Sequence, residues 1–338
     1  MKTLSVIVPS YNSEAYIEKC VMTLIASSHD LEIIIVNDGS MDSTQIIAER
    51  LKVEYPSLIK VVHQRNLGHG GAVNTGIKHS TGKYIKVVDS DDWVNPESLK
   101  KVIHQLSLLE FQETPVDMMI CNFMYDKVGK VNKRIMSYEK ILPENMMFTW
   151  SEVGKFKQSQ YILMHSVIYN RRVLEACALQ LPEHTFYVDN LFVYLPMVYV
   201  DKMYYMNTCL YHYFIGRDDQ SVNEANMIKR IDQQLKVNQM MIQNVDFSLM
   251  KDKRKIQYMT HYLKIVTTVS SLLLIKIGDK EAFKAKEMLW QSIKKYDYSI
   301  YLKIRTSLLG HMLHMPGLLG RKIILFTYEK AQKRLGFN

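Results

Sequence analysis

Residues 84–94, YIKVVDSDDWV, predict a buried strand that breaks into a turn carrying three carboxylates. Three other hydrophobic, strand-like runs precede it: LSVIVPS (4–10), LEIIIVNDGS (31–40) and IKVVHQ (59–64). Segments with apolar residues at helical spacing separate the runs: SEAYIEKCVMTLIASS (13–28), STQIIAERLKVEY (43–55, with Ser43 as the expected N-cap) and GGAVNTGIKHS (70–80). Strands that are hydrophobic throughout and are joined by helices predict a parallel α/β sheet covered on both faces.

The composition is that of an ordinary globular protein. Of 338 residues, 47% are hydrophobic and 23% charged, which argues against disordered and collagen-like classes. The four cysteines form no CxxC pair, so we expect free thiols in a reducing compartment. The first residues lack the hydrophobic stretch of a secretory signal. The longest apolar window, 265–275, is too short to cross a bilayer. We therefore expect a cytoplasmic protein, peripheral at most to the inner face of the cell membrane.

The sequence predicts a division near residue 220. Residues 1–220 mix strand and helix patterns, whereas residues 221–338 are almost entirely helix-periodic. Charge is also divided unevenly, because residues 251–338 carry 18 Lys and Arg against 6 Asp and Glu, while the whole chain has a net charge of +9. A basic region behind a slightly acidic body indicates a surface for partners that bear phosphate.

Polar residues follow all four predicted strands. The clusters are Pro9-Ser10-Tyr11-Asn12, Asn37-Asp38-Gly39-Ser40, Asn66-Leu67-Gly68-His69-Gly70-Gly71 and Asp89-Ser90-Asp91-Asp92. Turn chemistry explains any one of them. Because ligands of parallel sheets bind beyond the carboxyl ends of the strands, four clusters on one rim indicate a binding site.

The acidic turn indicates a metal. Asp89, Asp91 and Asp92 repel one another, and a cation would offset that repulsion. Oxygen ligands at this density favour Mg²⁺ or Mn²⁺ over zinc, with substrate phosphates as further ligands. The first strand lacks the GxGxxG of NAD-binding folds, and no Walker A loop is present. Since Tyr11 can stack on a base and Asp38 can accept an imide N–H, a nucleoside diphosphate with a uracil-like base fits this set.

Four motifs resemble family 2 glycosyltransferases with the Rossmann-like GT-A fold: SVIVPSYNSEAYI (5–17), IIIVNDGSMDST (33–44), NLGHGGAVNTGI (66–77) and YIKVVDSDDW (84–93). The resemblance implies nucleotide-sugar binding by Pro9, Tyr11, Asn12, Glu14, Asp38, Asn66, Gly68, Asn74, Asp89 and Ser90. It places Asp89 near the ribose and Asp91, with Asp89, in the metal site. Many members carry Arg where this chain has Val73, so one cationic contact to the nucleotide is absent.

The resemblance also implies a catalytic base in FYVDNLF (186–192), where Asp189 is the candidate and Val188 stands in the usual place of a Glu. The alternative is that Asp189 caps a helix beginning at Asn190. In YHYFIGRDDQSV (211–222), Arg217 is the candidate phosphate ligand. His212 is a candidate for the metal shell, although a histidine between tyrosines is more often simply packed.

The basic residues near the C-terminus allow several interpretations. Residues 306–335 carry apolar patches flanked by Arg321, Lys322, Lys330, Lys333 and Arg334, which suits an amphipathic helix on an anionic membrane. Helices that pack on the core with solvated lysines, or a homodimer interface, remain open. No nucleic-acid-binding signature accompanies the charge, so we expect no nucleic-acid partner.

These features together predict a GT-A domain in residues 1–220 and a basic helical region in residues 221–338. The predicted activity is metal-dependent, inverting transfer of a hexose or N-acetylhexosamine from a UDP-sugar to a hydroxyl of a saccharide. By resemblance, the acceptor is linked to polyprenyl diphosphate in bacterial cell-surface polysaccharide assembly. A sugar-phosphate nucleotidyltransferase and a non-catalytic nucleotide-sugar-binding module are the alternatives.

Overall fold

The computed structural model describes residues 2–27, 30–127, 134–216 and 223–335, the last five by their backbone alone. The chain forms two compact units. The first consists of Met1–Lys155 and Ile162–Ile215, and the second of Phe156–Tyr161 and Gly216–Asn338.

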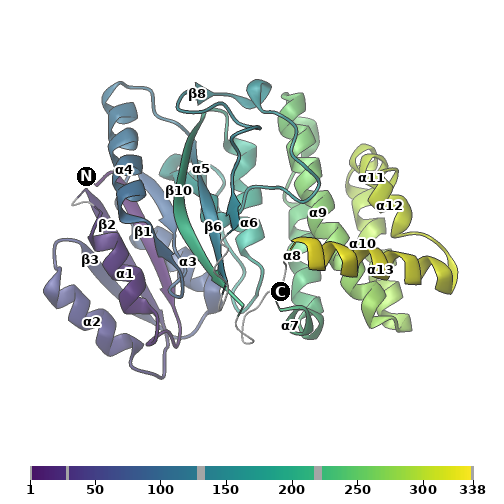
Figure 1. Cartoon of the computed structure of the whole chain (residues 1–338), viewed down its shortest axis with the longest axis horizontal. Helices are drawn as coiled ribbons and strands as arrows, with labels where there is room; N and C mark the ends of the chain where they lie inside the picture. Colours follow the sequence, from purple (N-terminus) through teal and green to yellow (C-terminus); the bar gives the residue numbers. More distant parts are fainter. Residues whose placement is uncertain (1, 28–29, 128–133, 217–222, 336–338) are drawn as a thin grey trace. The chain divides into compact units, whose positions relative to one another are not determined.

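The first unit is built on one mixed sheet in the order β3-β2-β1-β4-β9-β6-β10-β5 (Figure 1). β7 pairs with β6, and β8 pairs with β10. The strands are β1 Leu4–Ser10, β2 Leu31–Asp38, β3 Ile59–Gln64, β4 Tyr84–Val87, β5 Trp93–Val94, β6 Met118–Lys127, β7 Arg134–Met136, β8 Met147–Phe148, β9 Val167–Asn170 and β10 Met203–Ile215. β1 to β4 are parallel, as predicted. β9 is antiparallel to both β4 and β6, so the second half of the sheet is not simply parallel.

The helices of the first unit lie between its strands in the sequence. They are α1 Ile17–Ile25, α2 Thr44–Glu54, α3 Gly68–His79, α4 Pro96–Phe111, α5 Arg171–Ala176 and α6 Asp189–Tyr194, with 3₁₀ turns η1 Trp150–Glu152, η2 Met164–Ser166 and η3 Pro196–Tyr199. α1 starts four residues after the beginning of the segment 13–28 that was expected to be helical. The Ser13 carbonyl oxygen accepts the N–H groups of Tyr16 and Ile17 in a turn before the helix. Ser43 is at the N-cap of α2 as expected, but its side chain makes no capping bond. The Glu14 carboxylate instead accepts the Ser43 N–H at 2.8 Å.

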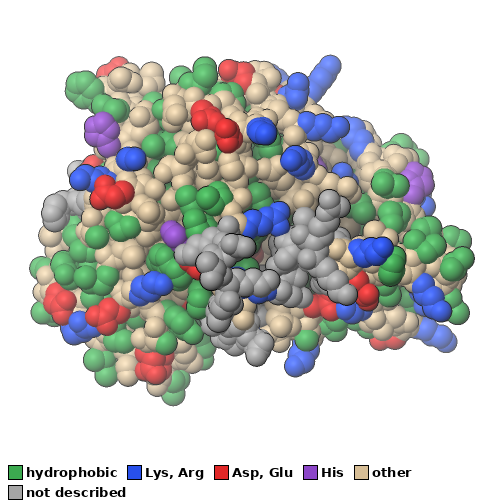
Figure 2. Space-filling view, in the orientation of Figure 1, with side chains coloured by type: hydrophobic (Ala, Val, Ile, Leu, Met, Phe, Trp, Pro, Cys, Tyr) green, Lys and Arg blue, Asp and Glu red, His purple; other side chains and the backbone are tan. Residues whose placement is uncertain are grey.

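The second unit is helical, which confirms the predicted C-terminal helical region. It contains α7 Glu224–Lys229, α8 Ile231–Gln243, η4 Phe247–Leu249, α9 Lys253–Ile277, α10 Lys280–Tyr296, α11 Tyr298–Arg305, α12 Leu308–Met312 and α13 Gly317–Leu335. Lys and Arg side chains are spread over its surface (Figure 2). Inside, Gln234 bonds Ser270 at 3.2 Å, and Trp290 bonds Ser271 at 3.0 Å, so α8 and α10 both hold α9. None of the helices in the described ranges is long and apolar enough to cross a membrane.

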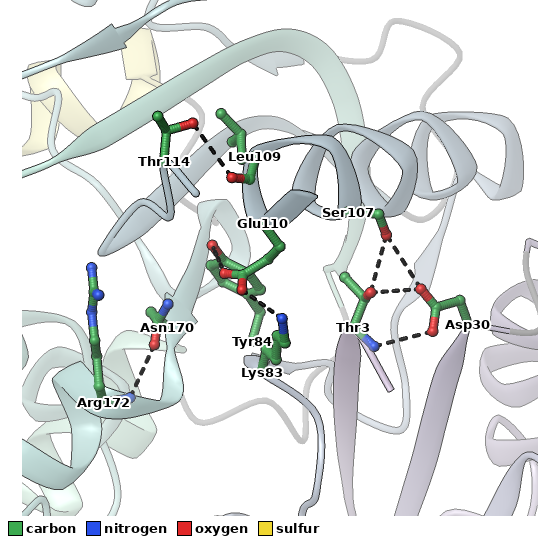
Figure 3. Close-up of polar contacts among 10 residues, drawn as sticks. All are labelled: Thr3, Asp30, Lys83, Tyr84, Ser107, Leu109, Glu110, Thr114, Asn170 and Arg172. Carbon is green, nitrogen blue, oxygen red and sulfur yellow. Dashed lines mark hydrogen bonds and ion pairs between the residues drawn. The ribbon is translucent and has the colours of Figure 1, made fainter. Parts of the chain in front are cut away.

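Polar contacts tie down the rim at the amino ends of the strands (Figure 3). Before β1, the Thr3 hydroxyl donates to Asp30 at 2.5 Å. At the start of β4, the Lys83 ammonium and the Tyr84 hydroxyl both bond Glu110 of α4, at 2.7 and 2.9 Å. These bonds fix the strand starts and the C-terminal end of α4 at one rim, so the loops at the opposite rim are built on a rigid frame.

Glu32 joins three segments at the same end of the sheet. Its carboxylate accepts the Ser5 hydroxyl at 2.6 Å and the Gly82 N–H at 3.0 Å, and it also accepts the Thr81 N–H. Partial burial alone would raise the pKa of Glu32, but these hydrogen bonds outweigh burial and lower it below its ordinary 4.5. The ionised carboxylate therefore stabilises the fold above about pH 4.5, and this contribution is lost as the pH falls through the lower folded-state pKa.

We predict that Glu32→Ala lowers the free energy of unfolding by about 1–3 kcal/mol at pH 7, because it leaves buried hydrogen-bond donors without an acceptor. Urea unfolding at pH 7, 5, 4 and 3 measures this loss, which should shrink below about pH 4.5. The exposed Glu54→Ala is the matched control and should change stability by less than about 0.5 kcal/mol. A loss for Glu32→Ala that stays constant across this pH range would contradict the assignment.

Candidate active site

The four strand-end clusters meet at one rim, because hydrogen bonds join each loop to its neighbours. The first and second loops are joined by Asn12, whose side-chain oxygen accepts the Met41 N–H at 2.9 Å. Asp38 joins the second loop to the third, and His69 joins the third to the fourth. The Ser13 and Ser90 hydroxyls, 2.7 Å apart, join the first loop to the fourth. The clusters predicted from sequence are therefore one connected site.

In the first loop, the candidate residues other than Tyr11 are buried or bonded to neighbouring backbone. Tyr11 is 51% exposed, as a base-stacking residue must be. Pro9 is buried within β1. Asn12 has a φ of +48°, and its side chain and that of Glu14 hold the second loop. These contacts make Asn12 and Glu14 parts of the frame under Tyr11; their predicted contacts with a nucleotide stay predictions.

Asp38 is buried at the end of β2. One carboxylate oxygen, Oδ1, accepts both the Gln64 side chain at 2.6 Å and the Leu67 N–H at 2.8 Å. Its other oxygen, Oδ2, makes no hydrogen bond within the described residues, which leaves an acceptor for a ligand N–H. Asn66, the next predicted residue, accepts the Gly68 N–H at 3.2 Å and shapes the start of α3.

The acidic turn is held by β10. The Tyr211 hydroxyl donates to Asp92 Oδ2 at 2.6 Å, and the Phe214 N–H donates to Asp92 Oδ1 at 2.7 Å. Tyr211 also accepts the Asp89 N–H at 3.2 Å. Asp92 is 2% exposed, so it is the internal anchor of the turn, while Asp89 and Asp91 are partly exposed.

Opposed charges surround this turn. Burial raises the pKa of Asp92 well above its ordinary value, and the charges of Asp91 and Asp89 raise it further. Burial would also raise the pKa of Asp89, but the His69 ring, 2.8 Å from its Oδ1, together with His165 and Lys86, outweighs burial and lowers it. An excess of carboxylates in a buried turn is the situation that a bound divalent cation relieves.

His165 completes a possible metal site that the sequence did not reveal. One ligand atom from each of Asp89, Asp92 and His165 lies within 4.8 Å of the others. His165 is 5% exposed, and neither of its ring nitrogens has a hydrogen-bond partner among the residues that the structure describes. Burial lowers its pKa to about 3, so the imidazole is neutral, the form that ligates metals. The two carboxylates suit Mg²⁺ or Mn²⁺, and an imidazole ligand, which transition metals favour, selects Mn²⁺ of these two.

Lys86 holds the segment that carries His165. Its ammonium is buried and donates to the carbonyl oxygens of Met164, His165 and Val167, at 3.2, 2.8 and 3.3 Å. Burial lowers its pKa to about 7. A lysine within the hydrophobic run YIKVV was a readable signal of a buried polar site, whereas His165 lies in a stretch without periodicity and gave none.

The structure places the other candidate ligands elsewhere or does not describe them. His212 stacks on Trp93, with ring centroids 5.5 Å apart, and its Nδ1 lies 3.5 Å from Asp126 Oδ2. Neither His212 nor Asp91 belongs to the three-residue group above, so their metal roles stay predictions. Arg217 lies outside the described residues, and its predicted phosphate contact is untested.

The glycine-rich third motif packs against residues 181–184. Asn74 donates to the Leu181 carbonyl at 2.8 Å and accepts the Leu181 N–H at 3.0 Å. A Cβ on Gly70 would lie 2.6 Å from the Pro182 oxygen, and Gly68 has a φ of +76° with His184 alongside. The close approach that these glycines allow is therefore to the chain itself, in the segment that leads to Asp189.

Asp189 is the first residue of α6. Val188 is at the N-cap position, and the Asp189 carboxylate accepts backbone N–H groups of this first turn, its own and that of Asn190. Burial raises the pKa of this carboxyl; the nearby His69 opposes that effect and Asp89 adds to it. A carboxylate with a raised pKa is a better proton acceptor than an ordinary surface aspartate.

Comparisons with known proteins agree with this geometry. The family model "Glycosyl transferase family 2" matches residues 5–174, about half of the chain. Putative glycosyltransferase EpsH of Bacillus subtilis is 32% identical over 222 residues, 63% of this chain and 60% of that protein. Glycosyltransferase GlyA of Streptococcus pneumoniae is 29% identical over 227 residues, 64% of this chain and 31% of that protein. The match thus spans 60% or less of the length of these relatives.

Solved structures show the same fold. S. aureus TarS 1–349 in complex with UDP-GlcNAc has a TM-score of 0.69 and 20% identity, covering 99% of this chain and 92% of that one. Mannosyltransferase PcManGT from Pyrobaculum calidifontis, in complex with GDP-Man and Mn²⁺, has a TM-score of 0.55 and 15% identity, covering 95% and 86%. The GT-A fold with a C-terminal helical region is thereby confirmed. Because the family match covers half of the chain and contains all four strand-end motifs, this chain belongs to glycosyl transferase family 2.

Proposed function

We propose that this glycosyltransferase moves a hexose or N-acetylhexosamine from a UDP-sugar to a hydroxyl of a saccharide acceptor, with inversion at the anomeric carbon. The observation that carries the proposal is the joining of all four strand-end loops around a buried acidic turn, with Asp189 beside it. Exposed Tyr11 would stack on the uracil ring, and the unused oxygen of Asp38 would accept its N–H.

A divalent metal fits the donor side of this site. Asp89 and Asp91, with an imidazole, would hold Mn²⁺ or Mg²⁺. The orphaned ring nitrogens of buried His165, which lies in one group with Asp89 and Asp92, support His165 as that imidazole. The bound metal would supply charge neutralisation at the diphosphate leaving group. One structural neighbour is a complex with Mn²⁺ and GDP-Man, and another is a complex with UDP-GlcNAc, which supports a nucleotide-sugar donor.

Asp189 would act on the acceptor side. Attack by a sugar hydroxyl on the anomeric carbon requires that the hydroxyl lose its proton. Asp189 is fixed in position by α6 and by residues 181–184, which Asn74 holds in place. We further propose, from the sequence resemblance, that the acceptor saccharide is carried on a polyprenyl diphosphate, and that the boundary near residue 220 separates the catalytic domain from the basic helical region.

UDP binding should depend on Mn²⁺ and on the acidic turn. Titration calorimetry with UDP, with and without Mn²⁺, should show tighter binding with the metal, and Asp91→Ala should abolish the difference because a ligand to the bridging cation is lost. Asp30→Asn, at the opposite rim, is the matched control and should bind UDP as the wild type does. Equal metal-dependent binding by Asp91→Ala would remove Asp91 from the metal site.

The two histidines give a sharper test of the metal shell. His165→Phe should weaken Mn²⁺ binding about tenfold or more, whereas His212→Phe should leave it nearly unchanged, since His212 stacks on Trp93. Electron paramagnetic resonance of free Mn²⁺ measures both affinities without substrate. The opposite ranking would assign the imidazole ligand to His212.

Asp189→Asn should lower kcat about 10²–10⁴-fold while changing UDP affinity less than about threefold, because the amide keeps the shape but accepts no proton. Transfer is measured by UDP release with a saccharide acceptor, and UDP affinity by calorimetry. Asn190→Ala, one residue along α6, is the neighbouring control. Transfer by Asp189→Asn near the wild-type rate would assign the base to another residue.

A further inference from the structure

The outer face of α13 is apolar, although its inner face already packs on the helical unit. Ile324 is 3% exposed and Gly320 is buried, and a Cβ on Gly320 would lie 2.7 Å from Met315 Cβ. The Arg321 guanidinium lies 3.8 Å from the centroid of the Phe283 ring on α10. These contacts fix which side of the helix faces inward.

The opposite side carries large hydrophobic residues. At 100° per residue, four exposed apolar side chains share one half of the helix surface with two exposed lysines and Glu329; we call the apolar and lysine side chains the α13 outer face: Leu318, Leu319, Lys322, Ile323, Phe326 and Lys330. Leu318 and Leu319 are 74% and 72% exposed, and Phe326 is 58% exposed. The Lys330 ammonium lies 4.5 Å from the Phe326 ring centroid, so charge and apolar surface are in direct contact.

The surroundings of this face are basic. Residues 251–338 carry 18 Lys and Arg against 6 Asp and Glu. Figure 2 shows Lys and Arg side chains beside hydrophobic ones over the C-terminal helices, on the right of the view. On α12, Leu308 adds another apolar side chain that is 73% exposed.

We propose that the α13 outer face binds a lipid surface containing acidic phospholipids. The apolar side chains would enter the boundary between headgroups and acyl chains, while Lys322 and Lys330 would reach the headgroup phosphates. A lysine-bearing apolar face suits this environment, because lipid offers apolar and anionic layers at adjacent depths. A single helix of this kind gives weak, reversible attachment that depends on salt.

Charge argues against a second copy of the chain as the occupant. In a two-fold symmetric contact the same surface meets itself. In each copy, the two lysines Lys322 and Lys330 would then enter an apolar, desolvated interface in which that face offers one carboxylate, Glu329. Like charges in such a contact disfavour association.

Cosedimentation of the full chain with vesicles tests the proposal. The protein should pellet with phosphatidylcholine vesicles that contain 30% phosphatidylglycerol, and at least about fivefold less with pure phosphatidylcholine or at 0.5 M salt. Leu319→Glu/Phe326→Glu and Lys322→Glu/Lys330→Glu should each lower the bound fraction at least about fivefold. Phe111→Glu, at the exposed C-terminal end of α4, is the control and should bind as the wild type does.

The inference does not depend on the proposed donor, so UDP affinity and the melting temperature of each variant should equal those of the wild type. Absence of wild-type binding to anionic vesicles, or unchanged binding by both double variants, would overturn it. Light scattering without lipid provides the remaining outcome: a dimer that Leu319→Glu/Phe326→Glu converts to a monomer would make this face an interface between copies and would also overturn the proposal.

Discussion

The buried carboxyl of Asp92 is the constraint on which the site depends. Three carboxylates in four residues repel one another, and an unanchored turn would spread them into solvent. Two bonds from β10, donated by the Tyr211 hydroxyl and the Phe214 N–H, prevent this. The turn is thus held in place by the protein before any ligand arrives, and Asp89 and Asp91 are presented together.

Helix α3 connects the acidic turn with the segment that carries Asp189. His69 contacts Asp89, and its charge also acts on Asp189, so α3 lies between the acidic turn and the candidate base. Asn74, on the same helix, holds Leu181 at the start of the segment that leads to α6. Because one short helix orders both carboxyl groups, their relative positions follow from the fold and not from the substrate.

The sequence predicted the half of the sheet whose contacts are local. The runs predicted for β1 and β3 match the observed strands. β2 ends two residues before the end of its predicted run, and β4 ends within its own. All four polar clusters follow these strands, because a hydrophobic run and the turn after it can be recognised without knowing their partners. The part around His165 was not predicted. β9 and its flanking turn are short, and they are placed by contacts between distant residues, among them the Lys86 bonds, the bond between the Tyr138 and Ser166 hydroxyls, and pairing with β4 and β6.

The same distinction between local pattern and distant contact applies to the site residues. Asp38 and the acidic turn could be found because carboxylates after strands are conspicuous. The sequence did not show that Asn12, Glu14 and Asn74 hold neighbouring loops, since their partners are backbone groups 29 or more residues away. Lys86 was visible as a charge in a buried strand, but the three carbonyl oxygens that it bonds were not.

The most direct test of the central claim is an anomalous difference map at the manganese edge, from crystals grown with Mn²⁺ and UDP. The account predicts one peak that is ligated directly by carboxylate oxygens of the Asp89–Asp92 turn and by the diphosphate of UDP. A manganese peak remote from this turn, or a diphosphate bound there without any metal, would contradict it.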